Sequence, residues 1–398
     1  MNQTVSAERL HIALFGKRNA GKSSLINALT GQDLALVSDV KGTTTDPVKK
    51  AMELLPLGPV VLIDTPGFDD SGELGEKRVQ KTEEVLSKTD IALLVSEGTS
   101  PDAAEQAFAE KLQKRNIPYI IVFNKADRLA VLPQATDREI YVSALTGTGI
   151  YELKERLGKL ARDKGTPRRP VADLLQSGDT VVLVVPIDAS APKGRIILPQ
   201  QQTLRDILDA GCSAVVCQPE QLTATLDNLN KPPRMVITDS QVFGKVAPLV
   251  PEEIPLTSFS ILFARYKGDL LTQVKGASVL TTLSQGDKVL ISEGCTHHRQ
   301  CGDIGTEKLP RWISAVAEGT PEFSFTSGGT FPTDLSEYKL VVHCGGCMLT
   351  ETEMRYRLQS AAEAGVAVVN YGVAIAHIHG LLARSLELFP DALVLLRQ

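Results

Sequence analysis

The chain of 398 residues lacks three features that would assign it to broad protein classes. It has no run of about 18 apolar residues, so we expect no membrane-spanning helix. Residues 1–10 are polar and mixed in charge, unlike the basic start and apolar run of a secretory signal peptide. The net charge is −5, without the basic excess that is typical of broad nucleic-acid binding. We therefore expect a cytoplasmic protein with neither a membrane nor a nucleic acid as partner.

Cysteine is scarce, with six residues in the whole chain. Four of them lie in the last third of the chain, as Cys295, Cys301, Cys344 and Cys347. Because disulfides are rare in the cytosol, this grouping favours metal binding over cross-linking. Cys212 and Cys217 flank an apolar run and are expected to be core residues.

Residues 10–165 alternate apolar runs with amphipathic stretches, which predicts a doubly wound parallel α/β sheet. The predicted strands are 11–15, 60–63, 91–95, 119–124 and 139–142, and the predicted helices are 22–29, 77–89 and 102–115. A basic stretch with glycine and proline at 163–170 predicts a linker. We therefore place the first domain at residues 1–165.

Two smaller α/β domains are predicted after the linker, at 171–266 and 267–398. The predicted strands are 181–187, 213–217 and 234–238 in the first of them, and 288–292, 339–343 and 366–370 in the second. The predicted helices are 203–210, 269–283, 309–318, 350–364 and 380–388. No catalytic motif is found in 171–266.

The segment from Gly16 to Ser23 matches G-x-x-x-x-G-K-[ST], the phosphate-binding loop of nucleotide hydrolases. It follows a predicted strand and opens a predicted helix, which is the context that this loop requires. Backbone N–H groups and the helix N-terminus would hold the phosphates. Lys22 would reach the β- and γ-phosphates, and Ser23 would bind Mg²⁺.

Further motifs follow in the order and spacing of translation-factor-like GTPases, which this segment resembles. Asp64 and Gly67 belong to Asp-Thr-Pro-Gly, where the carboxylate would bind Mg²⁺ and the Gly67 N–H would sense the γ-phosphate. Asn124, Lys125 and Asp127 belong to Asn-Lys-Ala-Asp. The Asp127 carboxylate can accept from both N1–H and the 2-amino group of guanine, which adenine lacks.

The remaining nucleotide contacts are expected from two loops. Ser143-Ala144-Leu145 resembles the loop that closes on the guanine O6, and residues 42–46 resemble switch I of the Era/TrmE-like group. Thr44 would complete the Mg²⁺ shell, and the loop would order with the γ-phosphate. The nucleotide is thus expected to lie against Gly16, Asn19, Ala20, Gly21, Lys22, Ser23, Ser24, Thr43, Thr44, Asp64, Gly67, Asn124, Lys125, Asp127, Ser143, Ala144 and Leu145.

Two residues bear on the rate of GTP hydrolysis. Phe68 stands where Ras-like proteins have a glutamine, and its ring cannot hydrogen-bond a water. Asn19 stands where potassium-activated relatives bind a monovalent cation, which would neutralise developing charge; alternatively, Asn19 only caps a turn. We therefore expect slow, K⁺-stimulated hydrolysis with Asn19, Lys22, Ser23, Thr44 and Asp64 as the catalytic set.

Two groups of cysteine and histidine follow predicted strands near the end of the chain. Cys295 and His297 follow strand 288–292, His343 ends strand 339–343, and Cys344 and Cys347 follow that strand. If both strands are parallel in one sheet, the two groups meet at its ligand-binding edge. Spacing alone leaves three interpretations: a zinc site that also uses Cys301, an iron–sulfur cluster, or unrelated buried cysteines.

The combination of this GTPase with C-x-H … H-C-x-x-C resembles HydF, the family of GTPases that mature [FeFe]-hydrogenase. Cys295, His297, His343, Cys344 and Cys347 carry the resemblance together with the Gly16–Ser23 loop, and it extends over the whole chain. It implies a GTPase domain, a middle dimerisation domain that forms a homodimer, and a cluster-binding domain.

The resemblance also implies a [4Fe–4S] cluster on Cys295, Cys344 and Cys347, with one iron left for another ligand. His297 or His343 could be that ligand or could hydrogen-bond within the core, and Asp188 is a further candidate. The implied role is a scaffold that carries a diiron precursor between the radical-SAM maturases HydE and HydG and the hydrogenase apoprotein. The alternative is an Era/TrmE-like GTPase that assists RNA or ribosome maturation and has a zinc-stabilised C-terminal domain.

Overall fold

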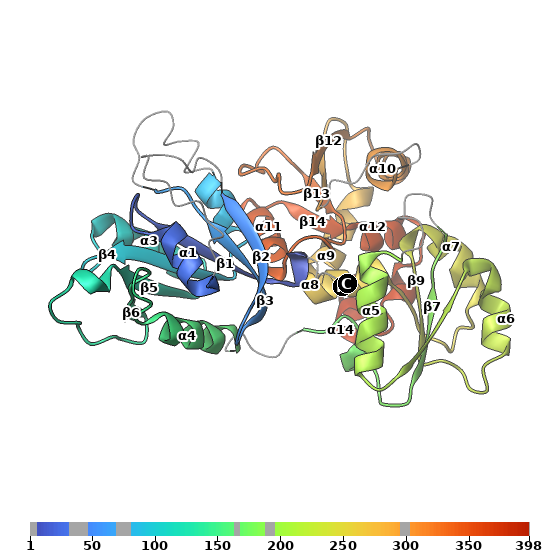
Figure 1. Ribbon diagram of the computed structural model, residues 1–398. Coiled ribbons are helices and arrows are strands. Elements are labelled where there is room, and N and C mark those ends of the chain that lie inside the picture. The colour runs from blue at the N-terminus through green and yellow to red at the C-terminus, as the bar shows by residue number, and fades with distance from the viewer. Residues whose placement is uncertain are drawn as a thin grey trace. The chain divides into compact units, whose positions relative to one another are not determined.

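The structure is a computed structural model that describes residues 6–31, 47–68, 81–162, 168–187, 196–294 and 303–397 (Figure 1). The chain divides into two compact units, Met1–Pro167 and Arg168–Gln398. In the described part of the chain, no helix combines the length and the apolar character that a membrane crossing needs.

The first unit contains a six-stranded sheet in the order β2-β3-β1-β4-β5-β6. Its strands are β1 (Leu10–Gly16), β2 (Val48–Leu54), β3 (Gly58–Asp64), β4 (Ile91–Glu97), β5 (Tyr119–Asn124) and β6 (Glu139–Tyr141). Helices α1 (Lys22–Thr30) and α4 (Ile150–Arg162) cover one face, and α3 (Ala103–Lys114) covers the other. Apolar side chains therefore point alternately to the two faces, as in a doubly wound sheet.

The sheet is mixed, which corrects the expectation of a wholly parallel one. β2 pairs with β3 in antiparallel register, whereas the other neighbours are parallel. Only three residues, 55–57, join β2 to β3. So short a connection forms a hairpin, because a parallel crossover needs about a dozen residues or more.

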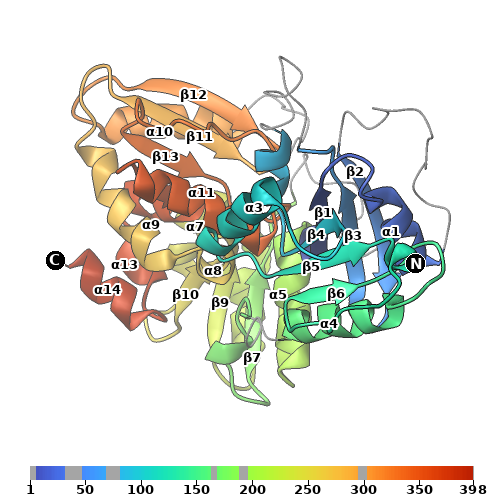
Figure 2. The same ribbon diagram turned by 90° about the vertical axis from the view of Figure 1, so that its left-hand side faces the viewer.

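The second unit contains two four-stranded sheets, each wholly parallel in its pairings. The first has the order β10-β9-β7-β8, built from β7 (Thr180–Val184), β8 (Ser213–Cys217), β9 (Met235–Thr238) and β10 (Leu256–Ser258). The second has the order β12-β11-β13-β14, built from β11 (Lys288–Glu293), β12 (Glu322–Ser327), β13 (Leu340–His343) and β14 (Ala367–Asn370). Figure 2 shows β11, β12 and β13 side by side.

The helices of the second unit cover both faces of both sheets. They are α5 (Leu198–Asp209), α6 (Leu222–Asp227), α7 (Phe243–Val246), α8 (Phe259–Lys267), α9 (Leu270–Ala277), α10 (Leu309–Val316), α11 (Glu351–Glu363), α12 (Tyr371–Ile378), α13 (Leu382–Ser385) and α14 (Pro390–Leu396). Thr350 is the N-cap of helix α11, and its hydroxyl accepts the Glu353 N–H at 3.1 Å.

A single apolar core joins the two sheets of the second unit. Val181 and Leu183 of one sheet and Val289 and Ile291 of the other belong to it, together with α8, α9 and α12. The intervening residues of each strand face separate clusters on the outer sides. The predicted division after residue 266 falls in α8, within this shared core, and it stays a prediction.

Candidate nucleotide site and candidate metal centre

The phosphate-binding loop runs from the end of β1 to the start of α1, as the motif predicts. Gly21 has φ 87°, and a Cβ there would lie 2.3 Å from the side-chain nitrogen of Asn124. Only glycine therefore fits at this position. The close approach brings the loop against the carboxyl end of β5.

Lys22 is buried, and its ammonium lies inside the loop. Its Nζ donates to the carbonyl oxygens of Gly16 at 3.0 Å and Lys17 at 2.7 Å. A fixed cation surrounded by the loop backbone is the arrangement that binds a polyphosphate.

Ser23 and Asp64 meet although they lie on different elements. The Ser23 hydroxyl donates to Asp64 Oδ2 at 2.5 Å. Burial raises the pKa of the Asp64 carboxyl, and the Ser23 hydrogen bond and the Lys22 charge oppose this shift. The contact brings together the two groups expected to bind Mg²⁺, directly or through water.

Asn124 ties the guanine-recognition motif to two other loops. Its side-chain amide donates to Ala20 O at 3.0 Å and accepts the Ala144 N–H at 3.1 Å. The Ser143 hydroxyl donates to Asp127 Oδ1 at 2.5 Å, and this bond lowers the pKa of the Asp127 carboxyl. The structure thus brings together the predicted base-binding residues while the Asp127 carboxylate stays exposed and ionised.

Two ion pairs at this site have no counterpart in the sequence motifs. Lys125 pairs with Glu97 and also donates to Asn19 O at 2.8 Å, and Lys17 pairs with Asp102. Asp102 is also the N-cap of α3, in a capping box that is readable as Asp-x-x-Glu. The capping box was therefore visible in the sequence, but its link to the phosphate loop was not.

Other predicted residues of the nucleotide site have mixed outcomes. Phe68 stacks on Phe108, with ring centroids 4.9 Å apart and planes 6° apart, so its partly buried ring packs against the core. Asn19 has φ 60°, which suits a tight turn and leaves its cation-binding role a prediction. Ser24 lies in the first turn of α1, and Leu145 is 86% exposed. Thr43 and Thr44 lie outside the described residues.

Strands β11 and β13 are parallel neighbours, with Ser292 opposite His343. This confirms the expectation that the two cysteine motifs follow strands that end at one edge. The chain leaves β11 for β12 on one side and returns to β13 on the other. The topological switch point of the sheet therefore lies between β11 and β13, the two strands that the motifs follow. Such a point is where α/β proteins bind ligands.

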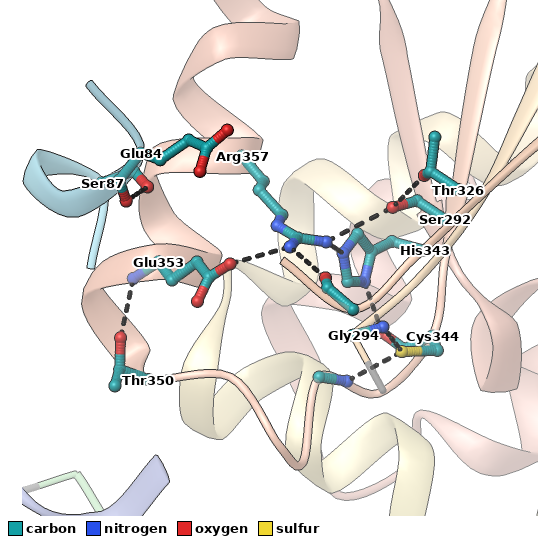
Figure 3. A network of polar contacts seen from close by, with 12 residues as sticks. Glu84, Ser87, Ser292, Gly294, Thr326, His343, Cys344, Thr350, Glu353 and Arg357 are labelled. Atoms are coloured by element: carbon teal, nitrogen blue, oxygen red, sulfur yellow. Dashed lines mark hydrogen bonds and ion pairs between the residues drawn. The ribbon is translucent and has the colours of Figure 1, made fainter. Parts of the chain in front are cut away.

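Cys344 lies where the two strand ends meet (Figure 3). Its Sγ accepts the backbone N–H groups of Gly294 at 3.0 Å and Gly346 at 3.4 Å. Burial raises the pKa of the Cys344 thiol to about 11. Burial also raises the pKa of Cys347, and the charge of Lys267 opposes that shift. Without a metal, both thiols are therefore protonated at neutral pH.

Both ring nitrogens of His343 are already engaged in hydrogen bonds. Nδ1 lies 2.8 Å from Cys344 O, and Nε2 lies 3.0 Å from an Arg357 guanidinium nitrogen (Figure 3). Because arginine can only donate, Nε2 accepts and Nδ1–H donates. Burial and the Arg357 charge lower the pKa of His343 to about 3, so the ring is neutral. These contacts favour the core hydrogen-bonding role of His343 over ligation.

Arg357 itself is fully buried and anchored on several sides. It donates at 2.8 Å to Glu353 Oε1 and to Gly328 O. The chain of contacts therefore runs from Glu353 through Arg357 and His343 to the backbone of Cys344 (Figure 3).

The other half of the cysteine motif is not described. Cys295, His297 and Cys301 follow Gly294 in the sequence and lie outside the described residues. Asp188 also lies outside them. Within the ranges that the structure describes, no three His, Cys, Asp or Glu side chains gather as a metal ion would require. Cys212 and Cys217 are buried, as expected for core residues.

Three family models match the chain in succession. Residues 11–125 match the 50S ribosome-binding GTPase model, 171–268 the hydrogen maturase F dimerization domain, and 271–388 the hydrogen maturase F tetramerization domain. The P-loop GTPase fold expected for the first domain is thereby confirmed. A tetramerization domain was not among the sequence predictions.

Individual relatives match the GTPase segment. The tRNA modification GTPase MnmE of Xanthomonas campestris is 39% identical over 158 residues, which cover 39% of this chain and 35% of the relative. MnmE of Legionella pneumophila is 38% identical over 151 residues, 37% of this chain and 34% of the relative. The match thus spans about a third of the length of these relatives. The crystal structure of Aquifex aeolicus Era is similar at a TM-score of 0.35 and 20% identity, covering 52% of this chain and 93% of Era.

Proposed function

Because the chain belongs to the hydrogen maturase F (HydF) family, we propose that it is a GTP-hydrolysing scaffold that carries an iron–sulfur cluster and delivers the diiron precursor of [FeFe]-hydrogenase. Two family-specific domain models, at 171–268 and 271–388, support this assignment beyond the GTPase segment. The observation that carries the cluster proposal is the contact of Gly294 N with Cys344 Sγ at 3.0 Å.

That contact matters because Gly294 directly precedes Cys295 in the sequence. We assign the cluster to Cys295, Cys344 and Cys347 as thiolate ligands. The donor set fits, because backbone N–H groups directed at Cys344 Sγ stabilise a thiolate and tune an iron–sulfur cluster. Gly346 has φ 61° and allows the tight turn between the two cysteines. When bound, a cluster with three thiolates supplies one iron with an exchangeable ligand position.

For the fourth ligand, His297 remains a candidate and His343 becomes a weaker one. Ligation by His343 would break either its hydrogen bond to Cys344 O or the one from Arg357. We therefore propose that His343 holds the Cys344 backbone through Nδ1–H, in the tautomer that Arg357 selects.

In the GTPase unit we propose that Lys22 holds the β- and γ-phosphates while Ser23, Asp64 and Thr44 hold Mg²⁺. Gly67 N–H would sense the γ-phosphate, and the 124–127 and 143–145 loops would hold guanine. Phe68 is packed against Phe108 and does not orient the attacking water, which supports slow hydrolysis. A K⁺ ion near Asn19 would supply the missing positive charge.

The proposed partners follow from the family. They are a second copy of the chain, the radical-SAM maturases HydE and HydG, and the hydrogenase apoprotein. Nucleotide state would regulate these encounters rather than drive the cluster chemistry. The dimerization and tetramerization models support self-association.

Anaerobic reconstitution with iron, sulfide and, in parallel, zinc tests the proposal. We expect the purified chain to take up iron and sulfide and to become brown, and Cys344→Ser to lose that uptake. Cys212→Ser is the matched control, because Cys212 is a buried cysteine outside the motif, and it should retain iron. Tight zinc binding at one ion per chain without iron uptake would contradict the cluster.

The alternative is an RNA- or ribosome-maturation GTPase with a zinc-stabilised C-terminal domain. The similarity to MnmE favours it, but that similarity covers only 39% of this chain. The alternative predicts that RNA binds the purified chain and stimulates hydrolysis; the scaffold proposal predicts no effect of RNA.

A further inference from the structure

Lys267 is the last residue of α8 and is one of the most deeply buried charged residues of the second unit. Only 3% of the residue is exposed. Burying an ammonium group is costly unless the group is fully hydrogen-bonded. Its surroundings must therefore supply partners for the charge.

Three backbone carbonyls of one loop accept hydrogen bonds from the Lys267 ammonium. Nζ donates to the carbonyl oxygens of Leu349 at 2.7 Å, Cys347 at 3.0 Å and Gly346 at 3.3 Å. An ammonium has three donors, and here each finds a backbone acceptor around Cys347. The lysine thus fixes the segment between the second cysteine and helix α11.

The lysine and the loop come from different parts of the chain. Lys267 lies in the segment matched by the dimerization model, 171–268, whereas Cys347 lies in the segment matched by the tetramerization model, 271–388. Helix α8 is held in the core that joins the two sheets, and Arg168 donates to Gly268 O at 2.8 Å just beyond its end. The cysteine loop therefore depends on a residue outside its own domain model.

We propose that Lys267 is a positioning residue for the cluster site, which holds the Cys347 loop in place and supplies a fixed positive charge that raises the reduction potential of the bound cluster. The proposal rests on the cluster assignment made above. Reduction adds negative charge to a cluster, and a buried cation close to its ligands favours the reduced form. None of the sequence motifs identified above includes this lysine.

The loop-holding role is tested on the full chain without iron, by amide hydrogen exchange of peptides that cover residues 344–350. In Lys267→Met we expect these amides to exchange roughly tenfold faster than in the wild type, because the loop loses three charge-assisted hydrogen bonds. Lys275→Met, an exposed lysine on the next helix, is the control and should not change the rate. Equal rates in Lys267→Met and the wild type would overturn the holding role. This measurement needs no cluster, so it remains decisive even if the wild type takes up no iron and the cluster proposal fails.

The charge role is tested by a redox titration of the reconstituted protein, followed by electron paramagnetic resonance. We expect Lys267→Met to lower the midpoint potential by about 59 mV, a tenfold change for a one-electron couple. Lys267→Arg keeps the positive charge, so its midpoint potential should equal that of the wild type. An unchanged potential in Lys267→Met, or an equal shift in both variants, would overturn this role. Loss of iron from Lys267→Met alone would support the need for the charge, whereas loss from both variants would count against it.

Discussion

The nucleotide site and the site around Cys344 and Cys347, here called the cysteine centre, both lie at the carboxyl ends of parallel strands, but their side chains are held in different ways. At the nucleotide site, motif residues hold one another: Ser23 contacts Asp64, and Asn124 contacts Ala20 and Ala144. At the cysteine centre, residues outside the motif hold its backbone, with Arg357 acting through His343 and Lys267 through three carbonyls. A short motif can therefore specify the first site almost completely but specifies only the proposed ligands of the second.

The comparison predicts that the two sites can be inactivated separately. Lys22→Ala should lower the rate of GTP hydrolysis roughly 100-fold or more, because it removes the fixed cation from the phosphate loop. Phosphate release measures the rate, and iron uptake by the same variant should stay at the wild-type level. Lys114→Ala, an exposed lysine on α3, is the control. Hydrolysis by Lys22→Ala at half the wild-type rate would contradict the role of the lysine.

The buried ion pair of Arg357 with Glu353 should contribute more to stability than an exposed arginine–glutamate pair on the same helix. Arg357→Met removes the charge partner of buried Glu353 and should lower the free energy of unfolding of the second unit by about 3–5 kcal/mol. The only tryptophan of the chain, Trp312, lies on α10 and reports unfolding of this unit by fluorescence.

The matched control lies two residues away on the same helix. Arg355 pairs with Glu351 across the same i,i+4 spacing, but its side chain is 57% exposed. Arg355→Met should therefore cost less than about 1 kcal/mol. Equal losses in the two variants would show that burial does not distinguish the pairs.

The potassium prediction concerns the nucleotide site alone. In the wild type we expect GTP hydrolysis to be faster in KCl than in NaCl, and in Asn19→Ala we expect the two rates to differ by less than about twofold. The comparison of the two salts at equal ionic strength isolates the cation. Equal wild-type rates in NaCl and KCl would remove the cation from the mechanism.

The smallest expected effect is a pH dependence of the first unit. Burial lowers the pKa of His11 below its usual 6.5, and the Asp90 charge opposes this shift. Between the folded pKa and 6.5 the unfolded chain binds more protons, so stability is complete above 6.5 and falls as the pH drops through that window. Hydrogen exchange of β1 peptides measures this loss, and His11→Gln should flatten it. A β1 exchange free energy that rises on acidification would contradict the assignment.

Much of the fold could be predicted from hydrophobic patterns. The strand predicted at 119–124 is β5, that at 213–217 is β8, and the parallel pairing of β11 with β13 is confirmed. The pattern failed where strands are short or lie at an edge. β2 is mostly exposed and carries two adjacent lysines, and β10 has only three residues, so neither has the apolar alternation that marks a strand.

The two candidate sites were predictable to different degrees, because a sequence shows local spacing but not the contacts that the tertiary fold creates. The phosphate loop and the guanine motif have fixed local spacing, which the chemistry of GTP requires. Lys267 and Arg357 lie 80 residues before and 10 residues after Cys347, and only the tertiary fold brings them to the cysteine loop. Nothing in a single sequence distinguishes a buried lysine at a helix end from a solvated lysine at a helix end, because burial is set by packing.

The assignment of Cys295 is the central claim, and the metal content of four single variants tests it most directly. After anaerobic reconstitution, Cys295→Ser, Cys344→Ser and Cys347→Ser should each lose most of the iron and the electron paramagnetic resonance signal of the reduced cluster. Cys301→Ser, outside the motif, should keep both. Full iron content and an unchanged signal in Cys295→Ser would contradict the claim that the residue following Gly294 joins Cys344 and Cys347 in one metal centre.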